Sequence, residues 1–255
     1  PFPTIVRDFQ AAIGKEARQQ ILHDAEKLPA AVVASVGGGA EAIGIFSAFL
    51  EDADVALVGV EGGGDGRRGG RTAATMSRGT LGVLHGSRTY VLQDNVGQML
   101  EEGSLAADMN YPGSNPELAM LKDSGRVSFV TVDDAKACAG FKALVGLEGL
   151  FPALEPAHAL YHAMELAEKM SSSDSIIVHL SGGGQKDAAL VERALLRQLE
   201  GGSKEAPLPP SMRTDPQTVF IIGAGPSGLV ALKEMREAGF DAHCVDAKSQ
   251  IGGVF

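Results

Sequence analysis

Short apolar runs rich in β-branched residues alternate with helical patterns from Ala30 onward. Such runs are typical of strands buried on both faces of a sheet, and the stretches between them carry apolar residues at helical spacing. The predicted strands cover residues 31–36, 55–60, 127–132 and 175–180. The predicted helices cover residues 40–50, 133–147, 157–170 and 186–199, with Asp133 or Asp134 capping the second. This alternation predicts an α/β fold, in which a parallel sheet carries helices on both faces.

A change of composition divides the chain after residue 200. Residues 201–217 combine prolines, glycines and scattered charges, which is a composition typical of a linker. Two further strands are predicted beyond it, at 218–222 and 242–246, around a glycine turn and a helix. The predicted domains are therefore residues 1–200 and a truncated Rossmann-like βαβ unit over 218–255, because about 40 residues cannot bury such a core alone.

Composition narrows the possible functions. The 255 residues are 44% apolar and carry a net charge of −10, and they lack the concentrated basic face that a nucleic-acid partner requires. The sequence contains no membrane-spanning apolar run, and its opening residues lead us to expect no targeting leader. Cys138 and Cys244 lie in a predicted helix and a predicted strand, which favours buried free thiols over a disulfide. We therefore expect a cytoplasmic protein with neither a nucleic-acid nor a membrane partner.

Two glycine turns follow predicted strands. Gly37-Gly38-Gly39 joins the first strand to a helix, and Ser181-Gly182-Gly183-Gly184 follows the strand at 175–180. Unhindered backbone N–H groups in such turns are suited to surround a phosphate. A single triple glycine is equally compatible with an ordinary tight connection, but ligands of parallel α/β proteins collect at the carboxyl ends of strands. We therefore expect the two turns to line one cleft.

Five groups of residues carry a resemblance to a known family. They are residues 3–10, Leu84-His85-Gly86 with Thr89-Tyr90, Tyr111-Pro112-Gly113, Glu148-Gly149 with Pro152-Ala153-Leu154-Glu155, and Leu180-Ser181-Gly182. In their order and spacing, the chain up to about Glu200 resembles the C-terminal part of tryptophan synthase β chains, most closely the version in fungal fused synthases. The resemblance implies half of a fold-type II enzyme that depends on pyridoxal phosphate. In that family L-serine and indole are condensed to L-tryptophan, a step of amino-acid biosynthesis.

The resemblance implies which residues contact the cofactor. Gly37-Gly38-Gly39 matches the loop whose backbone holds the cofactor phosphate. Ala40 and Glu41 replace a serine and an asparagine that add phosphate contacts in the family. A glutamate beside a dianionic phosphate is repulsive unless its side chain turns outward. Ser181 matches the hydroxyl that faces the pyridine nitrogen of the cofactor.

The resemblance also implies catalytic positions. Glu155 matches an active-site glutamate near the cofactor ring, and Asn110 replaces the aspartate that closes over the substrate. Asp108 replaces a glycine, which demands either a different backbone or a relocated carboxylate. Lys186 belongs to the Ser-Gly turn, and we interpret it as a structural cation rather than as the Schiff-base lysine. His85 and His158 are interpreted as packed or capping residues.

Further implications concern ions and partners. The backbone carbonyls of Gly37, Tyr111 and Gly113 match a monovalent-cation site. The family's Schiff-base lysine and its acid/base glutamate lie upstream of the part matched by Pro1, so we expect this chain by itself to be inactive. The complete protein is expected to be a homodimer and to work with an α-type domain or subunit.

A second pattern lies beyond the linker. Gly223-Ala224-Gly225-Pro226-Ser227-Gly228 follows a predicted strand and opens a predicted helix, which is the context that strengthens a GxGxxG pattern. Asp246, eighteen residues after Gly228, is placed to bind a ribose hydroxyl. Together with Ile251-Gly252-Gly253-Val254-Phe255, these residues resemble the start of the FAD-binding region of flavin-dependent monooxygenases. A generic dinucleotide-like turn is the alternative interpretation.

Three hypotheses stay open at this point. The first is a tryptophan synthase β-type lyase that is incomplete in this chain, and the length of the resemblance favours it. The second is an FAD-dependent monooxygenase or other oxidoreductase with a degenerate synthase-like region, favoured by the departures from the family at Ala40-Glu41 and at residues 183–185 and opposed by its short coverage. The third is a non-catalytic remnant, favoured by the missing upstream lysine.

Overall fold

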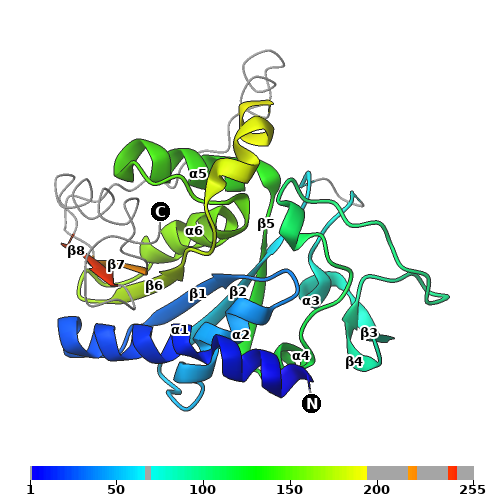
Figure 1. Ribbon diagram of the computed structural model, residues 1–255, viewed down its shortest axis with the longest axis horizontal. Helices are drawn as coiled ribbons and strands as arrows, with labels where there is room; N and C mark the ends of the chain where they lie inside the picture. Colours follow the sequence, from blue (N-terminus) through cyan, green and yellow to red (C-terminus); the bar gives the residue numbers. More distant parts are fainter. Residues whose placement is uncertain (1, 67–69, 194–217, 223–240, 246–255) are drawn as a thin grey trace.

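A six-stranded parallel sheet organises the chain. The computed structural model describes residues 2–66, 70–193, 218–222 and 241–245. The strand order is β5-β2-β1-β6-β7-β8, and every neighbouring pair in this sheet is parallel (Figure 1). Helices lie on both faces of the sheet, and together they confirm the predicted α/β fold.

The strands of the sheet are short and mostly apolar. Their bounds are β1 (Ala31–Ser35), β2 (Ala56–Gly62), β5 (Val127–Val132), β6 (Ser175–His179), β7 (Thr218–Ile222) and β8 (Asp241–Val245). Continuous apolar runs suit strands that are covered on both faces. The predicted strands agree with these bounds to within two residues, and the largest difference is at β2, which extends to Gly62.

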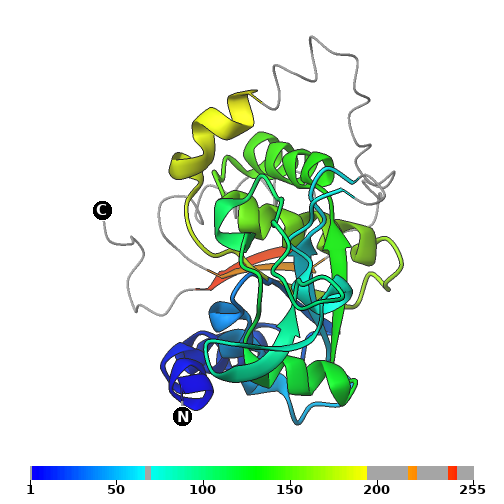
Figure 2. The same ribbon diagram turned by 90° about the vertical axis from the view of Figure 1, so that its right-hand side faces the viewer.

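Two apolar cores hold the helices against the sheet. The helices are α1 (Phe2–Ala25), α2 (Ala40–Phe46), α3 (Thr75–Arg78), α4 (Pro116–Asp123), α5 (Asp134–Glu148) and α6 (Leu154–Ala167), with 3-10 helices η1 (Ser47–Phe49), η2 (Ala107–Met109) and η3 (Gly184–Asp187). On one face Ile21 and Phe46 pack with Ile177 of β6. On the other face Val33 of β1 packs with Tyr161 of α6. Figure 2 shows the sheet edge-on between the two helical layers.

The start of α5 agrees with the prediction, and the start of α6 differs from it. Asp133 caps α5, because its carboxylate accepts the N–H of Lys136 at 2.8 Å, which confirms the predicted cap. Helix α6 begins at Leu154 rather than at residue 157. Pro156 is tolerated there because the first helical turn needs no intrahelical N–H donor. The free N–H of Leu154 is bound instead by Asp187, which is distant in the sequence.

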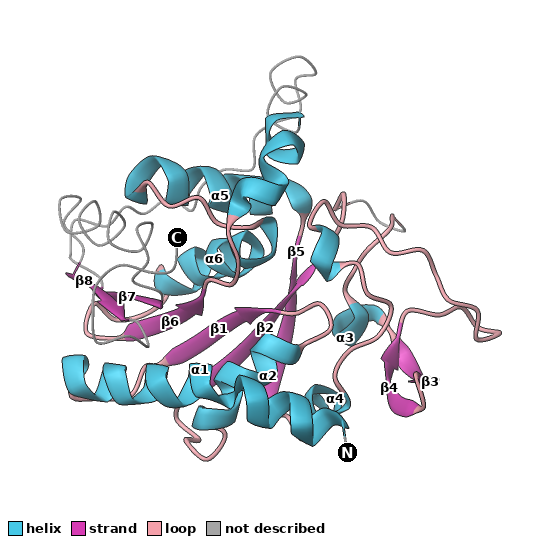
Figure 3. Cartoon of the chain, in the orientation of Figure 1, coloured by secondary structure: helices cyan, strands magenta, loops and turns pink. Residues whose placement is uncertain are grey.

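Several elements have no counterpart among the predicted ones: α1, α3, η2, α4 and the antiparallel hairpin of β3 (Thr80–Leu84) and β4 (Ser87–Val91) (Figure 3). Helix α1 crosses α2 closely, because a Cβ added at Gly14 would lie 2.6 Å from the carbonyl oxygen of Ile45. The predicted helix over 186–199 begins as η3, and residues 188–193 are helical beyond it. The remainder of that prediction lies outside the described residues.

The two C-terminal strands extend the sheet of the first region. β7 pairs with β6 through Ser175↔Thr218 to Val178↔Ile221, and β8 pairs in turn with β7. The predicted strand at 242–246 is found at Asp241–Val245. The domain boundaries stay a prediction, and so does the helix between the two strands, which lies outside the described residues. Within the described ranges, no helix combines the length and the apolar character needed to cross a membrane.

Glu61 is a buried carboxylate inside the sheet, and only 1% of it is exposed. Its two oxygens accept the N–H groups of Met76 and Ser77, at 2.6 and 2.8 Å, and the Ser77 hydroxyl at 2.6 Å. These bonds fix the start of α3 against β2. Burial nevertheless outweighs the donors and raises the pKa of Glu61 to about 7.

We therefore expect Glu61 to make stability fall as pH rises. The folded state holds this proton more tightly than the unfolded chain, so its contribution is complete below the ordinary pKa of 4.5 and is lost as pH rises through about 7. Between pH 5 and 8 the free energy of unfolding should fall by up to about 3 kcal/mol more in the parent than in Glu61→Gln. Urea unfolding at several pH values measures this difference. Identical pH profiles would contradict it.

Candidate functional site

The two predicted glycine turns line one cavity of about 380 Å³ at the carboxyl ends of β1 and β6. Gly37, Gly38 and Gly39 form one wall, and Ser181 and Gly182 form another. The arrangement is the one that the sequence predicted, because both turns leave the same edge of a parallel sheet. The roles assigned to the individual residues stay predictions.

The first turn requires glycine at two of its three positions. Gly39 has a φ of 86°, and a Cβ there would lie 2.5 Å from Cδ1 of Leu118. A Cβ at Gly37 would lie 2.4 Å from the carbonyl oxygen of Asp108. At Gly38 the nearest atom would be 3.9 Å away, on the ring of Tyr111, so this position has open space around it. The turn therefore approaches its neighbours through Gly37 and Gly39.

Ala40 and Glu41 continue the same wall in the first turn of α2. The N–H groups of a first helical turn have no partner within the helix, so those of this turn are available to an anion. Glu41 lines the cavity but is exposed to solvent. An outward-turned carboxylate is the arrangement that reduces its repulsion of a bound phosphate.

The second turn is joined to the segment that carries Glu155. The N–H of Ala153 donates to the carbonyl of Gly182 at 3.3 Å, and the N–H of Gly184 donates to the carbonyl of Phe151 at 2.9 Å. Asp187, at the end of η3, accepts the N–H of Leu154 at 2.9 Å. These contacts fix the separation between Ser181 and the start of α6.

Lys186 and Glu155 form an ion pair at the cavity wall. The ammonium lies 3.0 Å from both oxygens of Glu155, and it also lies 3.3 Å from Asp187 and 3.3 Å from Asp108. Partial burial opposes the charge of Lys186, but the hydrogen bonds to Glu155 and Asp187 outweigh it and raise the pKa of the ammonium. The geometry agrees with the interpretation of Lys186 as a structural cation.

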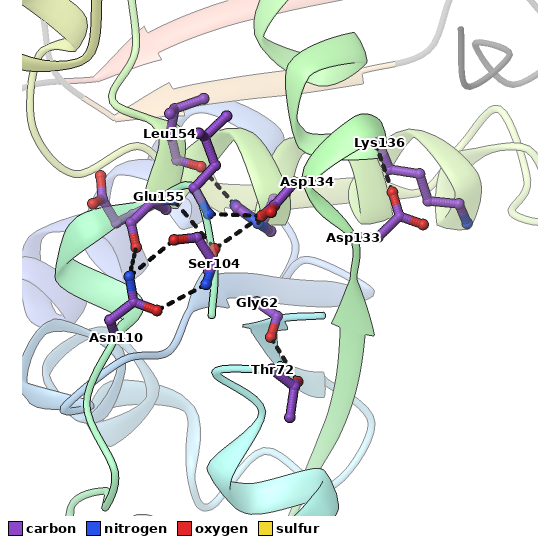
Figure 4. A network of polar contacts seen from close by, with 12 residues as sticks. Gly62, Thr72, Ser104, Asn110, Asp133, Asp134, Lys136, Leu154 and Glu155 are labelled. Carbon is purple, nitrogen blue, oxygen red and sulfur yellow. Dashed lines mark hydrogen bonds and ion pairs between the residues drawn. The ribbon is translucent and has the colours of Figure 1, made fainter. Parts of the chain in front are cut away.

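Asn110 lies outside the cavity lining. Its amide accepts the N–H of Ser104 at 2.8 Å and donates to the carbonyl of Ser104 at 2.9 Å (Figure 4). Asp134 anchors the same segment, since its carboxylate accepts the N–H of Leu105 at 2.9 Å. Asp108 and Met109, from η2, are the residues of this loop that line the cavity. The loop therefore presents a carboxylate at position 108 and uses Asn110 to hold its own shape.

The histidines in the family motifs lie outside the cavity lining. His158 is fully buried, its Nδ1 bonds the carbonyl of Leu154 at 2.7 Å, and burial lowers its pKa. His85 has a φ of 51° in the hairpin turn, and its Nδ1 lies 2.9 Å from the hydroxyl of Tyr111. Both arrangements agree with packing or capping roles.

The carbonyls proposed for a monovalent cation already have contacts. The carbonyl of Gly37 accepts the Ser114 hydroxyl at 3.5 Å, and that of Tyr111 accepts the Thr75 hydroxyl at 3.0 Å. A carbonyl oxygen has a second lone pair, so the cation site at these residues and Gly113 stays a prediction. In the part of the chain that the structure describes, no three His, Cys, Asp or Glu side chains are grouped to hold a metal ion.

Some lining residues were not predicted. Gln10 reaches the cavity from α1, and Ser35 reaches it from the end of β1. Residues 3–10 contain Gln10 and belong to the family resemblance, which was the one available signal. The predicted dinucleotide contacts Gly223, Gly225, Gly228 and Asp246 lie outside the described residues.

Comparison with known proteins gives two kinds of match. A family model described as an NAD(P)-binding Rossmann-like domain matches residues 221–255. Among solved structures, a fungal L-serine ammonia-lyase from Rhizomucor miehei is similar, with a TM-score of 0.56 and 18% identity, over 74% of this chain and 55% of that chain. A mutant O-ureido-L-serine synthase bound to O-ureido-L-serine matches with a TM-score of 0.44 and 18% identity, over 78% of this chain and 50% of that chain. The chain thus spans about half the length of the structures it matches, and the likeness to the ammonia-lyase supports the α/β fold.

We expect Gly39→Ala to lower the free energy of unfolding by more than the cost of placing alanine in a left-handed backbone conformation. Gly39→Ala should cost about 3 kcal/mol, because it adds overlap with Leu118 to the left-handed conformation. Gly86→Ala is the matched control, since its φ is 77° and no atom lies within 4 Å of the added Cβ. It should cost about 1 kcal/mol in urea unfolding. Equal losses would contradict close packing at Gly39.

We also expect Lys186 and Glu155 to be energetically coupled. Lys186→Met should cost about 2 kcal/mol, because the buried Glu155 and Asp187 lose their counter-charge. The 42% exposure of the Lys186 side chain keeps this loss below that of a fully buried pair. Adding Glu155→Gln to Lys186→Met should recover part of the loss. A double-mutant cycle with additive effects would show that the pair contributes nothing.

Proposed function

We propose that this chain is the cofactor-binding part of a tryptophan synthase β-type lyase. The proposed activity of the complete protein is condensation of L-serine with indole, dependent on pyridoxal phosphate. The observation that carries the proposal is that the Gly37–Gly39 turn, Ser181 and Glu155 line a single cavity. These are three of the positions for which the family resemblance implies cofactor contacts.

The chemistry of the lining fits the cofactor. The glycine turn offers backbone N–H groups to a phosphate, and Gly38 leaves space beside it. Ser181 lines the same cavity, and its hydroxyl is of the kind that can donate a hydrogen bond to the ring nitrogen. Glu155 is held beside the cavity by Lys186. Bound pyridoxal phosphate would supply an electron sink for reactions at the substrate's α-carbon.

The rest of the proposed activity depends on the complete protein. The ammonia-lyase with a similar fold is named for L-serine, which supports an amino-acid substrate of that type. L-serine, indole, the homodimer, the α-type partner, the monovalent cation and the cytoplasmic location all stay predictions. Because the chain spans about half the length of the structures it matches, we expect catalysis to need further residues.

We propose an FAD-dependent oxidoreductase as the second candidate. The match of residues 221–255 to an NAD(P)-binding Rossmann-like domain favours it, because that fold binds dinucleotides in general. The strands on either side of the glycine pattern, β7 and β8, are parallel neighbours in the sheet, as a dinucleotide-binding unit requires. FAD contacts at Gly223, Gly225, Gly228 and Asp246 belong to this candidate.

A titration of the purified chain with pyridoxal phosphate, followed by absorbance and induced circular dichroism, tests the first candidate. We expect saturable binding of one cofactor per chain. Gly38→Asp places a carboxylate in the open part of the turn and should weaken binding at least about tenfold by repulsion of the phosphate. Gly146→Asp makes the same change at an exposed position of α5 and should leave binding unchanged.

The outcomes separate the candidates. Pyridoxal phosphate binding that is insensitive to Gly38→Asp would place the cofactor elsewhere and contradict the proposed phosphate site. Absence of binding, together with quenching of FAD fluorescence by the chain, would move the proposal to the oxidoreductase. Supplying the upstream half of a family member, with its lysine, should add a Schiff-base absorbance band if the first candidate is right.

A further inference from the structure

Asp108 contacts three separate walls of the cavity. Its backbone carbonyl packs against the first glycine turn, where a Cβ on Gly37 would lie 2.4 Å from that oxygen. Its N–H donates to Oε1 of Glu155 at 3.0 Å, and its carboxylate lies 3.3 Å from Nζ of Lys186. One residue thus joins the loop over residues 104–110 to the phosphate-type turn, to α6 and to η3.

The charges along the cavity wall are unbalanced. Three carboxylates line it, on Glu41, Asp108 and Glu155, and among the described lining residues Lys186 is the one cation. Glu155 is 10% exposed and occupies Lys186 with both oxygens, so this pair is nearly neutral at the wall. The Asp108 side chain is 74% exposed, so its charge lies on the solvent side of the cavity.

The backbone contacts of Asp108 do not require its carboxylate. The N–H and carbonyl of any residue at this position can contact Glu155 and Gly37. The carboxylate adds a contact with Lys186, the cation among the described lining residues, and a negative charge on the solvent side of the cavity. Asn110, the neighbouring polar residue of the loop, is held by Ser104 and lies outside the lining. The influence of this loop on the affinity for charged ligands therefore depends on the Asp108 carboxylate.

We propose that Asp108 determines specificity by charge at the proposed cofactor site. Its carboxylate holds Lys186 and makes the solvent side of the cavity negative. The cavity then favours a phosphate ester whose other groups are neutral or cationic, and it disfavours one that also carries a carboxylate. L-serine joined to the cofactor therefore binds more weakly than it would without the Asp108 carboxylate. This inference rests on the proposed phosphate position at Gly37–Gly39.

Two ligands that differ in one carboxylate test the proposal. They are the reduced adducts N-(5′-phosphopyridoxyl)-L-serine and N-(5′-phosphopyridoxyl)ethanolamine, whose binding is followed by pyridoxyl fluorescence. Asp108→Asn should tighten the serine adduct by about fivefold, since a unit charge is removed near the second anion. Binding of the ethanolamine adduct should change by less than about twofold. Asp54→Asn removes the same charge at an exposed position away from the cavity and should change neither ligand.

The salt dependence of binding and the thermal stability of the variant provide two further readouts. The gain from Asp108→Asn should shrink in about 1 M salt, because exposed charges are screened. Thermal unfolding of Asp108→Asn should match the parent closely, and Asp108→Ser repeats the test should Asn fail to fold.

The failures are distinguishable. A serine-to-ethanolamine affinity ratio that is unchanged by Asp108→Asn, with both adducts bound, overturns the inference and leaves the proposed cofactor site intact. An equal tightening of both adducts also overturns it. In that case Asp108 would repel the phosphate that both adducts share and not the carboxylate of the serine adduct. If the parent binds neither adduct and no pyridoxal phosphate, both the proposed cofactor site and the inference are wrong.

Discussion

The pairing of the segment around Glu155 with the turn after β6 is the constraint on which the rest of the site depends. Backbone bonds join residues 151–153 to 182–184, Asp187 binds the first N–H of α6, and Lys186 binds Glu155. Because the same turn carries Ser181, these contacts fix one wall of the cavity as a unit. The Gly37–Gly39 turn forms the opposite wall, and its position follows from the neighbouring parallel strands β1 and β6.

Two buried carboxylates of the described residues, Glu61 and Glu155, are satisfied in different ways. Glu61 has neutral donors around it, so burial favours its protonated form. Glu155 is paired with a lysine that contacts both of its oxygens, and the pair lies at a wall that is open to solvent. The first arrangement serves the packing of α3 against β2. The second leaves charged groups at a cavity. There the exposed Asp108 carboxylate adds a negative charge that would interact with a charged ligand.

The C-terminal strands join the two proposed cofactor-binding regions through one sheet. β7 continues the sheet beside β6, which is the strand that leads to Ser181. The carboxyl ends of all these parallel strands face the same edge, so Ile222, the last residue of β7, lies at the edge of the sheet where the cavity lies. This shared edge is a physical reason to test pyridoxal phosphate and FAD on the same protein.

The sequence by itself determined the features that depend on local patterns. Apolar runs predicted the strands, Asp133 predicted the cap of α5, and the glycines predicted turns at the ends of β1 and β6. Only the tertiary structure decided which side chains meet. Asp187 starts α6 from 33 positions away, Asp134 anchors Leu105 from 29 positions away, and Asp108 reaches Lys186. These contacts arise from the packing of distant segments, and neither periodicity nor residue propensity carries information about that packing.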